Sequence, residues 1–157
     1  MATRETASLP TPIGMTDVDA IDGVITRIAI DPSPARSATA TPLDPTLQAA
    51  MNQLAAYFAG QLTVFDLPLA PAATPRGAAL RQAIVDIGYG DTARYGEIAA
   101  TIGSSARALG QACARNPFPI VVPCHRVLST GPNDHYSAGN GVATKRWLLT
   151  HEHEGSS

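Results

Sequence analysis

Apolar and polar positions near the start of the chain alternate as they do in strands. The run at 23–30, Gly-Val-Ile-Thr-Arg-Ile-Ala-Ile, is rich in β-branched residues, and the segment at 11–14, Thr-Pro-Ile-Gly, sets turn residues beside strand-forming ones. The pattern predicts a small sheet, with antiparallel strands, at the N-terminus.

A helical pattern follows this strand region. Asp44 can cap a helix that has Pro45 at its first position and Gly60 beyond its end. The apolar positions that fall on one face of this helix are Leu47, Met51, Leu54, Ala55 and Phe58.

A second helical region begins after a proline-rich stretch. Thr74 and Pro75 mark its start, and Leu80, Ile84 and Ile87 form an apolar stripe that stops at Gly88. The prolines before it indicate a stiff linker between two domains.

Two short helical patterns come next, at 95–102 and at 105–115, separated by Gly103 and Ser104. A short helix, a turn that contains glycine and a second helix are typical of the helix-turn-helix motif, although roughly half of such pairs merely pack together. A short buried strand, Ile-Val-Val at 120–122, is predicted just before Cys124.

These elements predict an α/β protein in two parts. We expect a small α/β domain with a short antiparallel sheet at 1–70, a linker at 71–75, and a mainly helical domain with the helix-turn-helix at 76–157. The chain is long enough to bury a core in each part.

The net charge of −2 at pH 7 argues against a nucleic-acid-binding protein until the charge is divided along the chain. From Asp91 to Arg146 the basic residues outnumber the acidic ones, whereas the first 90 residues lean acidic. No apolar stretch approaches the roughly 20 residues that span a bilayer, and the first ten residues lack the features of a signal peptide. We therefore expect a cytoplasmic protein with no membrane contact.

Two cysteines, Cys113 and Cys124, are too few for a disulfide scaffold and do not form a Cys-x-x-Cys pair. The four histidines show no metal-binding spacing around them, so neither a metal nor a cofactor is expected. Cys113 lies among alanines in the second short helix, where a cysteine acts as a small apolar residue, and we assign it to packing.

Residues 123–127, Pro-Cys-His-Arg-Val, resemble the hallmark of the O6-alkylguanine-DNA alkyltransferases. Further segments occur in the same order and at similar separations as in that family, so the resemblance covers nearly the whole chain. They are Tyr-Gly-Glu-Ile-Ala at 95–99, Ala-Arg-Ala-Leu-Gly at 106–110, Asn-Pro at 116–117 and Lys-x-Trp-Leu-Leu-x-His-Glu at 145–152.

The resemblance implies that Cys124 accepts an alkyl group from O6-alkylguanine in DNA. A thiol is only slightly ionised at neutral pH and needs a base, and His125 can take its proton through a water. A carboxylate, matching Glu152 or else Glu154, would orient this histidine. The thioether product has no route back, so one turnover per molecule is expected.

The resemblance also implies that the helix-turn-helix binds DNA. The target oxygen is inaccessible in a stacked duplex, so the nucleotide must rotate out of it. Arg107 resembles the family's arginine finger, and Tyr95 resembles the tyrosine that crowds the phosphate. Ala106 and Gly110 keep the second helix slim for the minor groove, while Arg115 can contact phosphates. The resemblance therefore implies that the partner is double-stranded DNA that contains alkylated guanine, and we expect a monomer to bind it.

Four further residues are implied for the pocket and hinge. Asn116 resembles the hinge asparagine, whose side chain bonds the turn beside the cysteine, while Tyr136 and Ser137 match the loop over the pocket. Lys145 lies at the end of this stretch of sequence, and the segment from Tyr136 to Lys145 is longer than is usual in the family. His135 stands where a small residue is usual, so the preferred alkyl size stays open.

Two other functions remain as alternatives. One is a lesion-binding protein that resembles the alkyltransferases but transfers nothing and lacks the cysteine. The other is a Cys-His hydrolase, which would need an oxyanion hole and a water-accessible acyl site. The presence of Cys124 argues against the first, and no other feature of the chain supports the second.

Overall fold

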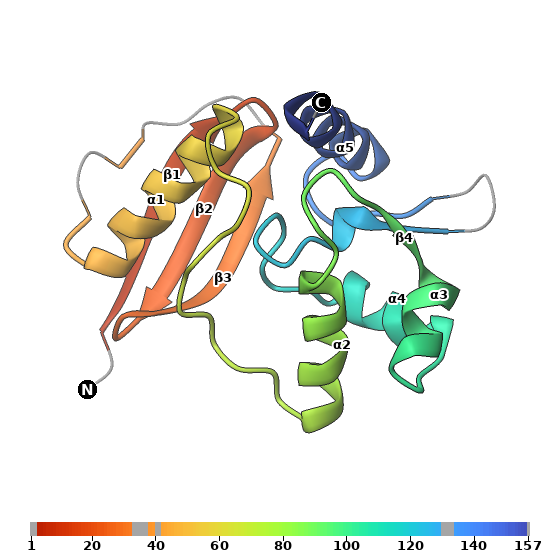
Figure 1. The fold of residues 1–157 in the computed structure, drawn as a ribbon. Helices are drawn as coiled ribbons and strands as arrows, with labels where there is room; N and C mark the ends of the chain where they lie inside the picture. The colour runs from red at the N-terminus through yellow and green to blue at the C-terminus, as the bar shows by residue number, and fades with distance from the viewer. Residues whose placement is uncertain (1–2, 33–37, 40–41, 130–133, 157) are drawn as a thin grey trace. The chain divides into compact units, whose positions relative to one another are not determined.

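The computed structural model describes residues 3–32, 38–39, 42–129 and 134–156, and the chain divides into two compact units, Met1–Ala70 and Pro71–Ser157. The first unit combines a three-stranded antiparallel sheet with one helix, and the second is mainly helical (Figure 1). The predicted α/β fold class is confirmed.

The sheet consists of β1 (Arg4–Thr11), β2 (Gly14–Ile21) and β3 (Val24–Asp31), paired in that order. A tight turn joins β1 to β2, and Gly14, which pairs with Thr11, has a φ of 118° that favours glycine. Sequence patterning located β3 but missed nearly all of β2 and most of β1, which contains Pro10. Because β1 is an edge strand, a residue without an N–H is tolerated there.

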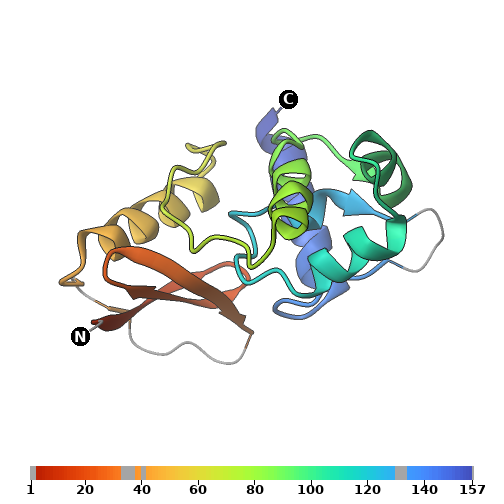
Figure 2. The ribbon, with the colours of Figure 1, turned by 90° about the horizontal axis from the view of Figure 1, so that it is seen from below.

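Helix α1 (Pro45–Phe58) packs on one face of this sheet, as Figures 1 and 2 show from two directions. Asp44 caps it as predicted, accepting a hydrogen bond from the amide of Thr46 at 2.8 Å. The predicted apolar face was partly wrong, because Ala55 is exposed and Phe58 is only half-buried. The residues buried on the sheet are Leu47, Ala50, Met51, Leu54 and Tyr57.

Helix α2 (Pro75–Val85) opens the second unit. Thr74 accepts a hydrogen bond from the amide of Gly77 at 3.0 Å, and Leu80 and Ile84 are buried. The helix ends before the predicted stop at Gly88. Ile87 is nevertheless buried beyond the helix end, because the chain turns back there.

Helices α3 (Tyr95–Thr101) and α4 (Ala106–Ala114) pack against each other in the second unit. Gly103 adopts a φ of 65° in the turn between them, and Ser105 caps α4 by accepting from the amide of Ala108 at 3.0 Å. This is the predicted helix-turn-helix. Just before α3, strand β4 (Ala93–Arg94) pairs in parallel with β5 (Val127–Leu128).

The strand predicted at 120–122 was wrong, because this segment forms a turn. Ile120 has a φ of 77°, and the amide of Val122 donates to the carbonyl of Phe118 at 2.8 Å. Prolines at 117, 119 and 123 lack the N–H that a strand ladder needs. The turn leads into a single 3-10 turn, η1 (Cys124–Arg126).

Helix α5 (Val142–Ser156) closes the chain and packs against η1. Leu148 on its inner face is fully buried, and Trp147 stacks on His151 with ring centroids 4.9 Å apart. Because α5 contacts η1, side chains near its end can reach the residues that follow Cys124.

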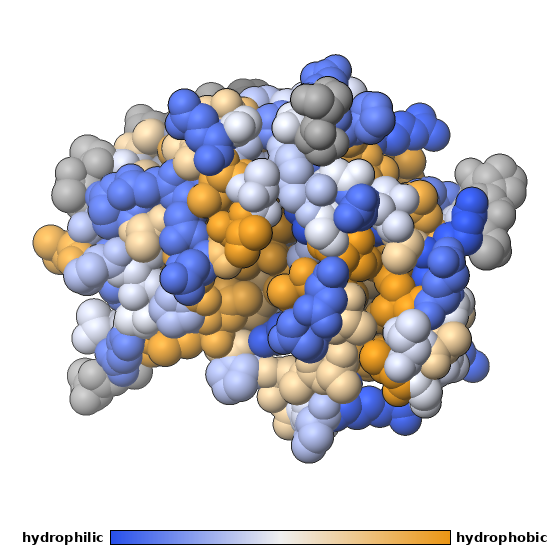
Figure 3. All heavy atoms as spheres, in the orientation of Figure 1, coloured by the Kyte–Doolittle hydropathy of each residue, from blue (hydrophilic) through white to orange (hydrophobic). Residues whose placement is uncertain are grey.

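Hydrophobic and hydrophilic side chains are both exposed on the surface. Hydrophilic side chains are spread over both units on the face shown in Figure 3. Within the described ranges, no helix has both the length and the apolar character that a membrane crossing requires.

Candidate functional site

Asn116 organises the turn that presents Cys124. Its amide nitrogen donates to the carbonyl of Val122 at 2.8 Å and to the sulfur of Cys124 at 3.2 Å. Its amide oxygen accepts from the backbone of Phe118 at 2.9 Å. One side chain thus closes both ends of the turn and touches the thiol.

A buried trio is formed by Glu152 and the two residues that follow Cys124 in the chain, His125 and Arg126. His125 Nε2 is 2.7 Å from Glu152 Oε2, and the guanidinium of Arg126 donates to both oxygens of the same carboxylate, at 2.8 and 3.0 Å. His125 and Glu152 are 0% and 1% exposed. Glu152 is therefore the acid that reaches His125, whereas Glu154 is exposed.

Sequence reasoning missed the part played by Arg126. Its Nε and NH2 groups bind Glu152, and its NH1 group donates to the carbonyl of Ile87 at 2.7 Å. Its guanidinium also lies over the ring of Tyr89. An arginine beside a buried nucleophile needs an acidic partner that is buried with it, and that requirement was the available signal. Arg126 locks the orientation of Glu152, and Glu152 in turn holds His125.

The electrostatics of His125 favour a neutral ring. Burial lowers the pKa of His125, although the hydrogen bond and charge of Glu152 oppose this shift. An ionised carboxylate can only accept, so we assign the ring proton to Nε2. Nδ1 then carries the lone pair, and no described residue hydrogen bonds to it.

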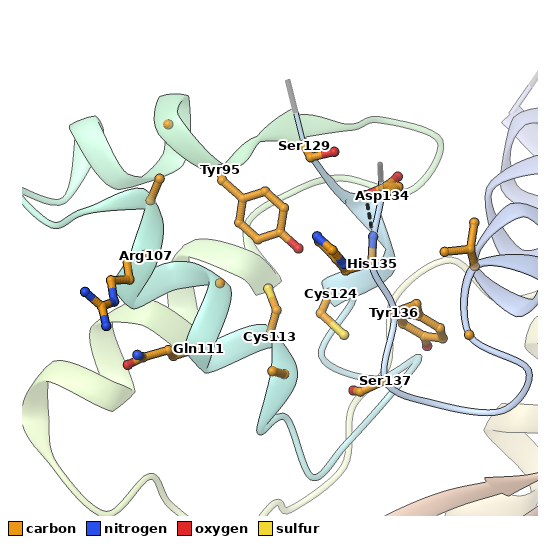
Figure 4. A pocket seen from close by; sticks show the side chains of 16 residues that line it. Tyr95, Arg107, Gln111, Cys113, Cys124, Ser129, Asp134, His135, Tyr136 and Ser137 are labelled. Atoms are coloured by element: carbon orange, nitrogen blue, oxygen red, sulfur yellow. Dashed lines mark hydrogen bonds between the residues drawn. The ribbon is translucent and has the colours of Figure 1, made fainter. Parts of the chain in front are cut away.

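Cys124 lines a cavity of about 1040 Å³ that lies wholly in the second unit (Figure 4). The cavity is bounded by Tyr95 from the start of α3, by Arg107 and Gly110 from α4, and by the segment that carries Tyr136 and Ser137. Ala106, Gln111 and His135 also line it. Of the residues expected to act on DNA or in the pocket, Tyr95, Ala106, Arg107, Gly110, Tyr136 and Ser137 are brought together here.

The remaining predicted residues lie off the cavity wall. Arg115 is exposed at the end of α4 and is not among the described residues that line the cavity. Asn116 acts from behind Cys124 through the hydrogen bond described above. Lys145 is fully buried and hydrogen bonds to residues 127, 134 and 135.

The two thiols of the cavity differ in their surroundings. Burial raises the pKa of Cys124, which is 4% exposed, while the Asn116 hydrogen bond and the Lys145 charge counter the rise. Burial and the nearby Cys124 raise the pKa of Cys113 to about 12. Cys113 is buried, as its assignment to packing implies, yet it also lines the cavity, as Tyr95 does.

Burial also raises the pKa of Tyr95, so its hydroxyl stays protonated near neutral pH. A protonated phenol can donate a hydrogen bond to a ligand in the cavity. No group of three or more metal-ligating side chains occurs in the part of the chain that the structure describes.

Comparison with known proteins matches both units to one family. A family model described as "6-O-methylguanine DNA methyltransferase, DNA binding domain" matches residues 77–154, and one described as the ribonuclease-like domain of the same protein matches residues 7–71.

Several relatives carry the name methylated-DNA--protein-cysteine methyltransferase. The protein of Mycolicibacterium paratuberculosis is 39% identical over 94% of this chain and 92% of its own length. The constitutive protein of Bacillus subtilis is 43% identical over 69% of this chain and 67% of its own. The alignment with the Methanosarcina acetivorans protein, at 46% identity, spans 65% of that protein, slightly under two thirds.

Solved structures agree along the whole chain. The O6-methylguanine methyltransferase of Mycobacterium tuberculosis superposes with a TM-score of 0.82 at 34% identity, covering 99% of this chain and 96% of that one. The OGT protein of the same organism in complex with DNA superposes with a TM-score of 0.79 at 37% identity, covering 96% and 93%. The chain therefore belongs to the O6-alkylguanine-DNA alkyltransferase family, the 6-O-methylguanine DNA methyltransferases.

Proposed function

We propose that this protein repairs DNA by moving the alkyl group of O6-alkylguanine onto Cys124, once per molecule. The observation that carries the proposal is the place of Cys124, which lines an open cavity beside the buried His125–Glu152 pair and receives a hydrogen bond from Asn116. The names of the relatives supply the same activity.

The neutral His125 ring serves as the base. With Nε2–H held by Glu152, Nδ1 can accept the thiol proton of Cys124 through one intervening water, since neighbouring side chains diverge. Glu152 then stabilises the imidazolium that forms. The Asn116 amide and the Lys145 charge favour the thiolate at the same moment.

The sulfur attacks the alkyl carbon, forming the S–C bond as the C–O bond to guanine breaks. The electron pair of the C–O bond passes to guanine, which takes up a proton to give the normal base. Tyr95 and Ser137 can donate hydrogen bonds to the guanine edge and so ease its departure. A thioether is not cleaved under these conditions, so the protein is consumed.

Duplex DNA is the proposed partner, and the damaged nucleotide must leave the stack to reach Cys124. Rotation costs a few kcal/mol, less where the damaged base pairs poorly. Arg107, exposed at the cavity mouth on α4, would fill the gap in the stack. The slim surface at Ala106 and Gly110 allows α4 to approach the minor groove, and one copy of the chain contains every residue named.

The test is the mass of the intact protein and of its peptides after mixing with a duplex that holds one O6-methylguanine. We expect a stoichiometric gain of one methyl group on the Cys124 peptide, none on the Cys113 peptide, and no gain in a Cys124→Ala variant. Tight binding with no mass gain would replace this proposal with a lesion-binding protein. A gain that exceeds one group per molecule would contradict single turnover.

A further inference from the structure

All four residues of the segment at 134–137 line the cavity, among them Tyr136 and Ser137. No helix or strand in the structure includes this segment. Its position therefore depends on side-chain contacts, and these converge on Lys145.

The ammonium group of Lys145 has three N–H donors, and each has an acceptor on another residue. Nζ donates to the carbonyl of Val127 at 2.7 Å, to Asp134 Oδ1 at 2.7 Å and to the carbonyl of His135 at 3.1 Å. Two of the three acceptors belong to the 134–137 segment. Lys145 is 0% exposed, so every one of these bonds is needed to offset the loss of water.

Val127 links the hydrogen bonds of Lys145 to the active site. It begins β5 directly after η1, the turn that contains Cys124 and His125. The single ammonium group of Lys145 thus ties the backbone behind the nucleophile to the segment across the cavity.

Asp134 supplies the only charge among the three acceptors. Its side chain is 26% exposed and lines the cavity, where an unpaired carboxylate would repel DNA phosphates. Partial burial alone would raise the pKa of Asp134, but the hydrogen bond and charge of Lys145 lower it. The carboxylate is therefore ionised at neutral pH, and the ammonium group of Lys145 compensates its charge.

We propose that Asp134 is a positioning residue for alkyl transfer, which holds Tyr136 and Ser137 at the cavity by pairing with the buried Lys145. The inference rests on the proposed function and assigns a further residue to it. Asp134 acts through Lys145 and the segment, and it takes no part in the bond changes.

Removal of the carboxylate by Asp134→Ala leaves a buried ammonium with two neutral carbonyls. The segment must then shift so that water can reach Nζ, and the guanine loses the wall formed by Tyr136 and Ser137. The groups that activate the thiol, His125 and Asn116, keep their own hydrogen bonds. Transfer from guanine should suffer while the chemistry of the thiol itself persists.

The experiment compares two reactions of the same thiol, each followed by peptide mass. The first is the single-turnover rate of methyl transfer from a saturating O6-methylguanine duplex. The second is carbamidomethylation of Cys124 by iodoacetamide, which needs no guanine in the cavity. The variants are Asp134→Ala, Asp134→Asn, which keeps an oxygen acceptor for Nζ, and the control Asp86→Ala, which removes an exposed acid of the same unit.

We expect Asp134→Ala to slow methyl transfer about tenfold or more, as misplacement of a bound substrate does, with iodoacetamide labelling as fast as wild type or faster. Asp134→Asn should lie between Asp134→Ala and wild type, and Asp86→Ala should match wild type.

Methyl transfer by Asp134→Ala at the wild-type rate would overturn the inference. So would a parallel loss of methyl transfer and iodoacetamide labelling, because that would mean general damage to the site. If wild type itself transfers no methyl group, the proposed function fails first, and this result is distinct from either of the other two.

Discussion

His125 Nε2 and Glu152 Oε2 lie 2.7 Å apart, and both side chains are almost completely buried. The two residues are 27 positions apart in the chain, and α5 packing on η1 brings them together. Arg126, which grips the same carboxylate, fixes the direction from which Glu152 meets the ring. The pair is oriented before any substrate arrives.

Glu152→Gln should impair both activity and stability. The amide removes the charge that would stabilise a protonated His125, and its NH₂ group cannot accept from Arg126. We expect methyl transfer to slow by about 100-fold or more. The free energy of unfolding should fall by about 3 kcal/mol, since one partner of a buried ion pair is lost.

The measurements are single-turnover transfer and urea unfolding monitored by circular dichroism. Glu154→Gln is the matched control, because it makes the same change at an exposed position of the same helix, and its effect on either quantity should be smaller. Equal effects of the two substitutions would contradict the assignment of Glu152 as the partner of His125.

Stability should fall as the solution is made acidic. Burial lowers the pKa of His125 in the folded protein, so the unfolded chain, with an ordinary value of about 6.5, binds the proton more readily. The folded state therefore loses stability as the pH drops below about 6.5, until the folded pKa is reached.

Thermal unfolding from about pH 7 to about pH 5 checks this sign. The melting temperature should decrease over that window in wild type and in a His153→Gln control, whose residue is exposed. The decrease should be smaller in His125→Gln. A melting temperature in wild type that rises on acidification would refute the prediction.

Asn116→Ala should make Cys124 a poorer nucleophile. The Asn116 amide is one of the groups that hold down the pKa of this buried thiol, and it also closes the preceding turn. Without it the pKa of Cys124 should rise further, and the free energy of unfolding should drop by about 1 kcal/mol.

The pH dependence of iodoacetamide labelling of Cys124, read by peptide mass, measures this pKa directly. The Asn116→Ala curve should move to higher pH, while the curve of Gln82→Ala, an exposed amide on α2, should overlay wild type. An unmoved curve for Asn116→Ala would show that the 3.2 Å contact does not favour the thiolate.

Local sequence signals predicted much of the fold because turn and cap residues act on their nearest neighbours. Asp44 and Thr74 mark their helix starts, and Gly103 with Ser104 separates α3 from α4. The apolar residues at 120–122 led to the wrong prediction of a strand. This segment forms a turn, in which Ile120 has a positive φ and prolines stand on both sides. A run of apolar residues reports burial, and burial alone does not select a strand.

The site was less accessible to local reasoning. Cys124 and His125 are adjacent, but their link to Glu152 came from resemblance to a family, which left Glu154 open as an alternative. The hydrogen bond from Lys145 to Asp134 was not predicted at all, because it joins two segments whose approach is set by the packing of α5. Long-range polar contacts of this kind become visible only when the fold is known.

Arg107→Ala should separate access to the base from the transfer reaction. Arg107 is exposed at the mouth of the cavity, and no shared hydrogen bond ties it to Cys124 in the described contacts. If it fills the stack after rotation of the nucleotide, its removal should slow transfer from duplex DNA by roughly 10- to 100-fold, equivalent to a few kcal/mol of unstacking. Transfer from the free base O6-methylguanine, which needs no rotation, should stay within about twofold of wild type. Single-turnover rates with both substrates, beside an Arg115→Ala control that should lose affinity for the duplex in a salt-dependent way, make the comparison. A parallel loss with both substrates would place Arg107 in the transfer step itself and remove the basis for its part in nucleotide rotation.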